Sequence, residues 1–146
     1  MSNKSHVAIL GVGKMGAAMA KELVAAGHSV HLWNRNKSVA DELLASLPQG
    51  SAQSHNTAHD ALVMADFAMC LFTNGQVTQS VLLDDPQTLA GVKSNLIVID
   101  MGTSGVDSAK ALDQALALKA IAFVDAPASG SIATIAAHRL LVMASG

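Results

Sequence analysis

Cysteine and aromatic residues are scarce in this 146-residue chain, which has one Cys, three Phe, one Trp and no Tyr. A single cysteine, Cys70, cannot form a disulfide within the chain, which fits a reducing compartment. It lies in the apolar run of residues 67–72, so we expect a buried, unreactive thiol. The core must therefore consist of Ala, Val, Leu, Ile and Met, as is usual where helices pack closely on a parallel sheet.

The sequence also lacks an excess of either charge and any long apolar run. The formal net charge is −2 and the pI is near 6.3, with no basic cluster to attract nucleic acid or a membrane surface. No apolar run approaches the roughly 18 residues that span a bilayer. Lys14 interrupts the apolar stretch that begins at Val7, which favours a first strand over a secretion signal. We expect a soluble, cytoplasmic protein with no nucleic acid or membrane partner.

A glycine-rich loop between a strand and a helix is the strongest motif in the chain. Residues 7–10 are apolar and of β type, Gly11, Gly13 and Gly16 follow in the pattern GxGxxG, and a helical pattern continues to about residue 26. In this order Gly11 permits the tight turn, Gly13 lets the backbone approach a pyrophosphate, and Gly16 lets the helix pack closely on the strand. The motif predicts a dinucleotide site at the start of the helix.

Apolar runs of strand length alternate with helical patterns along the rest of the chain. This alternation predicts an α/β fold of the Rossmann type, with a doubly wound, mainly parallel sheet in a single domain covering residues 1–146. Expected strands cover residues 29–33, 51–55, 67–72, 96–99, 122–124 and 140–144. Expected helices cover residues 39–46, about 57–65 with Asn56 or Thr57 as cap, 76–83, and a segment that Asp107 or Ser108 caps and that ends at Lys119.

The residues after the second strand bear on which dinucleotide is bound. An acidic residue there would accept hydrogen bonds from a ribose, whereas cations favour a 2′-phosphate. The chain has Asn34, Arg35, Asn36, Lys37 and Ser38, with no carboxylate before Asp41. Arg35 can meet a phosphate with its planar fork, assisted by Lys37 or Ser38, so we predict NADP (NADPH) in preference to NAD.

The carboxyl ends of parallel strands meet at one edge of the sheet, and this edge collects the predicted site. The candidate cofactor-binding residues are Gly11, Gly13, Lys14, Met15, Gly16, Asn34, Arg35, Asn36, Lys37, Phe72, Thr73, Asn74 and Thr103.

Three segments together resemble the β-hydroxyacid dehydrogenase family, which includes 3-hydroxyisobutyrate and 6-phosphogluconate dehydrogenases. They are the GVGKMG loop at residues 11–16, the WNR triplet at 33–35, and DAPASG at 125–130. The resemblance covers the whole chain. It implies that Thr103 approaches the nicotinamide ribose, and that Ser129 and Gly130 act in catalysis by holding the substrate carboxylate. The implied function is hydride transfer between NADP and a small β-hydroxy acid or semialdehyde.

The chain departs from the family pattern in two respects. Gly102 replaces a serine, while Ser131, Thr134 and His138 stand where glycines are common, so we expect side chains to intrude near the substrate. The family also has a second, helical domain with a catalytic lysine and most of the dimer interface. Since this chain has no counterpart, the resemblance implies a chain that binds cofactor but is inactive alone, and a homo-oligomer when that domain is present.

The sequence is also compatible with two other functions: a nucleotide-binding or sensor module without turnover, and an imine reductase relative. The six histidines lack a convincing set of metal ligands, so we expect surface or capping roles and no metal site. Lys110 and Lys119 are predicted surface lysines. We expect core positions for Met15, Met19, Met64 and Met69.

Overall fold

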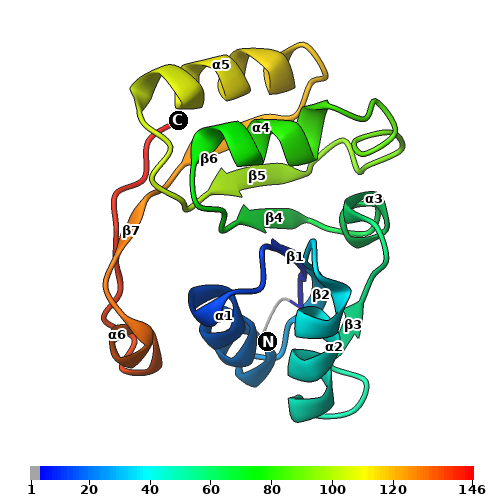
Figure 1. Ribbon diagram of the computed structural model, residues 1–146, viewed down its shortest axis with the longest axis vertical. Coiled ribbons are helices and arrows are strands. Elements are labelled where there is room, and N and C mark those ends of the chain that lie inside the picture. The colour runs from blue at the N-terminus through cyan, green and yellow to red at the C-terminus, as the bar shows by residue number, and fades with distance from the viewer. Residues whose placement is uncertain (1–3) are drawn as a thin grey trace.

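Six parallel strands form one sheet in the order β3-β2-β1-β4-β5-β6 in the computed structural model, which describes residues 4–146 (Figure 1). The strands are β1 (His6–Leu10), β2 (Ser29–Trp33), β3 (Ala52–Ser54), β4 (Phe67–Cys70), β5 (Ile97–Asp100) and β6 (Ala122–Asp125). The helices are α1 (Lys14–Ala25), α2 (Lys37–Ser46), α3 (Ala58–Leu62), α4 (Gly75–Leu83), α5 (Val106–Ala117) and α6 (Ile132–Ala136). The predicted Rossmann-type fold is confirmed.

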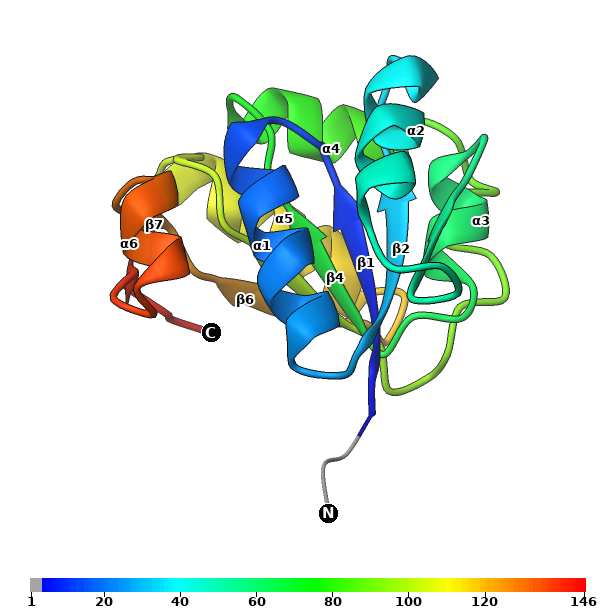
Figure 2. The same ribbon diagram turned by 90° about the horizontal axis from the view of Figure 1, so that it is seen from below.

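Helices cover both faces of the sheet (Figure 1). One apolar cluster joins the sheet to α3, α4 and α5, with Leu62, Leu82 and Leu112 almost fully buried. The other joins it to α1, α2 and α6 through Met19, Leu43 and Ile135. Figure 2 shows α6 beside α1 on this second face. Burial on both faces explains the continuous apolar runs of the central strands.

The strand order reverses between β1 and β4, which are neighbours in the sheet although their paired residues, such as Val7 and Phe67, are 60 positions apart in the sequence. The register pairs Leu10 with Cys70, so the two strands end at the same level. A crevice opens at such a point because the connections from the two strands leave toward opposite faces.

Several element ends differ from the sequence prediction because side chains or glycine terminate them locally. Thr57 caps α3 by accepting a hydrogen bond from the Asp60 amide, but this helix ends at Leu62 and not near residue 65. The α5 cap is Gly105, with φ +82°, and neither Asp107 nor Ser108 caps the helix. Strand β4 ends at Cys70, two residues before the apolar run ends, because Leu71 and Phe72 turn into the loop before α4.

The C-terminal segment does not extend the main sheet as a strand over residues 140–144. Instead β8 (Leu141–Val142) pairs antiparallel with β7 (Ala128–Ser129) in a separate two-stranded sheet. Helix α6, which the sequence did not predict, starts with a reciprocal capping box between Ser131 and Thr134. Small residues between the two strands had concealed its short helical pattern.

The histidines and methionines give two further corrections. Met64 is 52% exposed, so its predicted core role is wrong; it lies in the turn after the short helix α3. His31 is only 4% exposed, contrary to the surface or capping role that we expected. Its Nε2 lies 2.9 Å from His6 Nδ1, and its Nδ1 lies 2.9 Å from His55 Nε2. Strand pairing brings these rings together, which spacing in the sequence does not reveal.

Cys70 and the lysines follow the sequence prediction. The thiol is fully buried, and burial together with the nearby Asp100 charge raises its pKa. Lys110 and Lys119 are exposed. Within residues 4–146, no helix is long and apolar enough to cross a membrane.

Candidate functional site

Three adjoining pockets lie along the carboxyl ends of the central strands. The inner pocket, about 350 Å³, lies between the glycine loop and the loops after β4 and β5. The middle pocket, about 320 Å³, lies between the glycine loop, the end of β2 and α4. Gly13, Phe72 and Thr73 line both, and Trp33 and Arg35 connect the middle pocket to a third, outer pocket. The pockets form one continuous groove.

The glycine loop sits at the centre of this groove, and its backbone is too crowded for larger residues. A Cβ at Gly11 would lie 2.6 Å from the Leu71 carbonyl oxygen, and Gly11 has φ +96°. At Gly16 an added Cβ would contact the Gly11 carbonyl oxygen, so this helix packs directly on the turn. By contrast, among residues 4–146 no atom lies within 4 Å of a Cβ built at Gly13. Gly13 therefore keeps the open side of the loop free for a ligand.

The start of α1 provides the electrostatic feature of the groove. In the part of the chain that the structure describes, no side chain caps this 12-residue helix, whose N-cap is Gly13. The first amides of a helix have no partner within it, and they carry a partial positive charge. Lys14 and Met15, at these positions, line the inner pocket. An anionic group such as a phosphate fits here.

Asn34 ties the end of β2 to the glycine loop. Its Oδ1 accepts a hydrogen bond of 2.9 Å from the Val12 amide, and its Nδ2 donates to the Asn36 carbonyl at 3.0 Å. The side chain therefore shapes the loop in addition to lining the middle pocket, a role that the sequence analysis did not identify. Exposed Arg35 lines both the middle and the outer pockets.

Three predicted binding residues do not line these pockets, because their side chains have structural partners. Asn36 caps α2 by accepting hydrogen bonds from the Ser38 amide and hydroxyl. Asn74 caps α4 by accepting from the Val77 amide. Lys37 forms an ion pair with Asp41. The remaining ten predicted cofactor residues line the inner or middle pocket.

Asp100 holds the loop that forms one wall of the inner pocket. Its fully buried carboxylate accepts hydrogen bonds from the Gly102 amide and the Ser104 hydroxyl. Burial raises its pKa, and these two hydrogen bonds oppose that shift. The loop carries Thr103 into the pocket wall. Two hydrogen bonds beneath the wall thus tie the loop to the end of β5.

Gly102 lets two walls of the inner pocket approach each other. A Cβ at this position would lie 2.7 Å from the Phe72 carbonyl oxygen. The residue that departs from the family pattern is therefore required by the close contact between the loops after β4 and β5. Met101 and Ala128 also line this pocket; neither was a predicted cofactor residue, although Ala128 belongs to the DAPASG segment.

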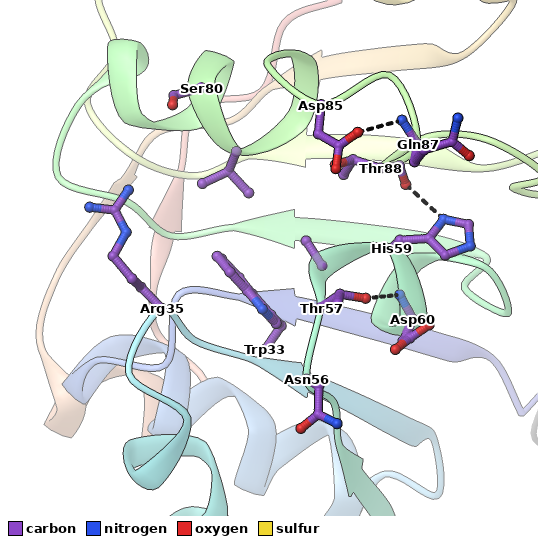
Figure 3. Close-up of a pocket in the computed structure, with 12 residues that line it drawn as sticks. Trp33, Arg35, Asn56, Thr57, His59, Asp60, Ser80, Asp85, Gln87 and Thr88 are labelled. Carbon is purple, nitrogen blue, oxygen red and sulfur yellow. Dashed lines mark hydrogen bonds between the residues drawn. The ribbon is translucent and has the colours of Figure 1, made fainter.

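The outer pocket, about 600 Å³, extends from the end of β2 to α3 and the loop after α4. Figure 3 shows Arg35 at one end, His59 at the other and Trp33 between them. His59 Nδ1 lies 3.2 Å from the Thr88 carbonyl oxygen, and Asp85 accepts a hydrogen bond from the Gln87 amide. The outer pocket therefore combines the Trp33 indole, which also lines the middle pocket, with polar groups around it.

The DAPASG segment lies beside the groove. Ser129 and Gly130 are exposed and do not line the inner pocket, whereas their neighbour Ala128 does. Contrary to the expected intrusion, Ser131 and Thr134 hydrogen-bond to each other at the start of α6. His138 has φ +57°, a conformation that glycine adopts readily.

Within residues 4–146, no group of three or more His, Cys, Asp or Glu side chains is arranged to hold a metal ion. The groove instead combines the uncapped start of α1, the glycine turn before it, and one pocket on each side of that turn. Such a site suits an elongated ligand with a central anionic group.

Comparison with known proteins supports this geometry. Residues 6–146 match the family model described as the NAD binding domain of 6-phosphogluconate dehydrogenase. The chain is 31% identical over 141 residues to the NAD-dependent L-serine dehydrogenase of Pseudomonas aeruginosa, covering 97% of this chain and 46% of that protein. It is 29% identical over 142 residues to the 3-hydroxyisobutyrate dehydrogenase of the same organism, with 97% and 46% covered.

Among solved structures, the chain is similar to the Mycobacterium tuberculosis 3-hydroxyisobutyrate dehydrogenase determined with L-serine. The TM-score is 0.88 at 28% identity, and the match covers 99% of this chain and 47% of that one. The chain spans about half the length of the curated relatives that it matches.

Proposed function

Because the chain belongs to the family of the NAD binding domain of 6-phosphogluconate dehydrogenase, we propose that it is the NADP-binding domain of a β-hydroxyacid dehydrogenase. The relatives named above are dehydrogenases, and the nicotinamide dinucleotide site is the family's shared feature. The proposed reaction is hydride transfer between NADP and a small β-hydroxy acid or semialdehyde.

One observation carries the proposal: the pockets flank the uncapped start of α1 on both sides. We assign the pyrophosphate to the open side of Gly13 and the first amides of α1. The adenosine half then lies in the middle pocket beside Arg35, and the nicotinamide half lies in the inner pocket beside Thr103. When bound, the nicotinamide supplies the hydride donor or acceptor.

The inner pocket's walls orient the nicotinamide half and limit its contact with water. Phe72 and Met101 provide apolar surface, and Thr103 provides a hydroxyl for the ribose. Asp100 supports this wall from below through the Gly102 amide and the Ser104 hydroxyl. We assign the substrate carboxylate to Ser129 and Gly130, which lie next to Ala128 at the edge of the same pocket.

Arg35 supports NADP as the preferred dinucleotide. It is an exposed cation that lines the middle pocket, and the end of β2 carries no carboxylate before Asp41. One named relative is NAD-dependent, so the preference needs a direct test in this chain. A guanidinium that binds a phosphate in a charge-assisted, bidentate manner strengthens binding by about tenfold or more.

The test is titration of the chain and of Arg35→Ala with NADPH and NADH. Arg35→Ala should weaken NADPH binding by about tenfold or more and NADH binding by about threefold or less. Lys21→Ala is the matched control, since Lys21 is an exposed cation on α1, two turns from its start. Equal losses for the two dinucleotides would reject the 2′-phosphate assignment, and no binding of either would reject the proposed function. An assay with a panel of small hydroxy acids then addresses the substrate.

The proposal includes a homo-oligomer for the complete protein. Leu141, Val142 and Met143, in and directly after β8, are 58%, 41% and 55% exposed. Exposed apolar surface of this kind supports an interface.

A further inference from the structure

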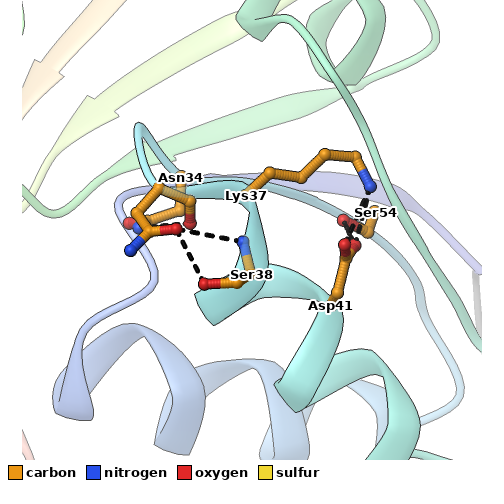
Figure 4. A network of polar contacts seen from close by, with 6 residues as sticks. Asn34, Lys37, Ser38, Asp41 and Ser54 are labelled. Carbon is orange, nitrogen blue, oxygen red and sulfur yellow. Dashed lines mark hydrogen bonds and ion pairs between the residues drawn. The ribbon is translucent and has the colours of Figure 1, made fainter.

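Lys37, the first residue of α2, is held by a carboxylate that two elements fix in place. Its Nζ lies 2.8 Å from Asp41 Oδ1 and 3.0 Å from Asp41 Oδ2. The Ser54 hydroxyl, from β3, donates to the same Oδ1 at 2.6 Å (Figure 4). The hydrogen bonds from Lys37 and then Ser54 keep the pKa of Asp41 below its usual value, so the carboxylate is charged at neutral pH.

This arrangement draws the ammonium group along α2 toward β3. Figure 4 shows Lys37 extending to Asp41 and Ser54, while Asn34 lies at the other side of the helix start. The Ser38 hydroxyl is also engaged, because it donates to Asn36 Oδ1 at 2.7 Å. Of the three side chains suited to a 2′-phosphate, only Arg35 lines the middle pocket.

We propose that Asp41, held by Ser54, is a specificity-determining residue that competes with the 2′-phosphate of NADP for Lys37 and thereby reduces the preference for NADP over NAD. The inference rests on the proposed function, since it needs a dinucleotide with its adenosine half beside Arg35. It assigns Asp41 to selectivity alone, because this residue lines neither the inner nor the middle pocket.

Asp41 and a 2′-phosphate can compete for Lys37 because both partners of the ion pair are accessible to water. The side chains of Lys37 and Asp41 are 44% and 48% exposed, and exposed pairs of this kind are weak and sensitive to salt. Lys37 begins α2 only two residues after Arg35. Its side chain is flexible, so it can reach either Asp41 or a phosphate bound beside Arg35. Removing the Asp41 charge should therefore release the ammonium group toward a phosphate.

The experiment is titration of Asp41→Asn with NADPH and NADH, and with the fragments 2′,5′-ADP and 5′-AMP. We expect NADPH and 2′,5′-ADP to bind about three- to fivefold more tightly than to the unmodified chain. NADH and 5′-AMP should change by about twofold or less, since they have no 2′-phosphate. Asp41 is exposed, so the fold should survive the substitution, which the thermal unfolding midpoint checks.

Two variants separate this competition from a general charge effect. Glu42→Gln removes the same charge from the next position of α2, where the carboxylate is exposed, and should leave the NADPH/NADH ratio unchanged. The double variant Lys37→Ala/Asp41→Asn should lose the gain seen with Asp41→Asn, because the released cation is gone.

The inference is overturned if Asp41→Asn leaves NADPH binding unchanged, if Glu42→Gln gives the same gain, or if the gain persists without Lys37. These outcomes are distinct from failure of the proposed function. That failure would show as no binding of either dinucleotide to the unmodified chain, and it would overturn this inference as well.

Discussion

The buried histidine His31 predicts a loss of stability in mild acid. His6, His31 and His55 form a row in which each neighbouring pair shares one short N···N contact. Each contact needs one N–H and one lone pair, so the row can carry at most one extra proton without placing two N–H groups face to face. A second proton must break a contact.

Burial is the main reason that His31 resists protonation, followed by the charges that His55 and His6 would carry and by Lys93. These effects lower its pKa from 6.5 to about 4. The Asp66 carboxylate does little to stabilise a charged His31, because it accepts a hydrogen bond from the His6 amide and pairs with Lys93.

The sign and size of the effect follow from proton linkage. The unfolded chain takes up a proton at His31 near pH 6.5, whereas the folded chain does so only near pH 4. The stabilisation is thus complete above pH 6.5 and is lost as the pH falls toward 4. Between pH 7.5 and 5 the free energy of unfolding should fall by about 2 kcal/mol from this residue. The pKa of His55 is also lowered by burial, which adds in the same direction.

Urea unfolding followed by circular dichroism at a series of pH values measures this loss. His31→Gln should flatten the pH dependence, because glutamine does not titrate. The control His138→Gln removes a histidine whose side chain is 75% exposed and should retain the slope. Asp41 and Asp66 have lowered pKa values and titrate below this window, and the raised pKa of Asp100 acts equally in both proteins. An identical slope in wild type and His31→Gln would refute the reasoning.

Two further predictions concern buried polar groups near the groove. Asp100→Ala leaves the Gly102 amide and the Ser104 hydroxyl without their acceptor and should lower the free energy of unfolding by about 1–3 kcal/mol in a urea titration. An unchanged midpoint and slope would argue against the supporting role of this carboxylate. Cys70 should react with an aromatic disulfide reagent at pH 8 only as fast as the protein opens, because burial raises the pKa of the thiol and excludes the reagent. Rapid labelling of the folded protein would contradict this assignment.

The sequence predicted most of the fold because helices and parallel strands leave local patterns. Residues 29–33 were predicted as a strand from their apolar content and are β2. The GxGxxG spacing correctly placed a turn between β1 and α1, since the crowding at Gly11 and Gly16 is built into that short segment. Ten of the thirteen predicted cofactor residues line the two central pockets for a related reason: the carboxyl ends of parallel strands share one edge.

The exceptions arise because other groups of the protein compete with a ligand for these side chains. Asn36 and Asn74 have residue types suited to a ligand, but local backbone amides take up their side chains as helix caps. The pair of Lys37 with Asp41 has the i,i+4 spacing of neighbours on a helix, so it is local to α2. Ser54 reaches Asp41 only because β3 pairs with β2, and this contribution cannot be read from the sequence.

The sequence by itself determined the alternation of strands and helices, the glycine turn and the cation at the end of β2, since each depends on neighbouring residues. The tertiary structure decided which side chains were free to face a ligand. It buried His31 between two other histidines, placed Asp100 beneath the wall that carries Thr103, and brought Ser54 to Asp41. Burial and contacts of this kind depend on groups brought together from different strands and helices, so they are settled only when the chain has folded.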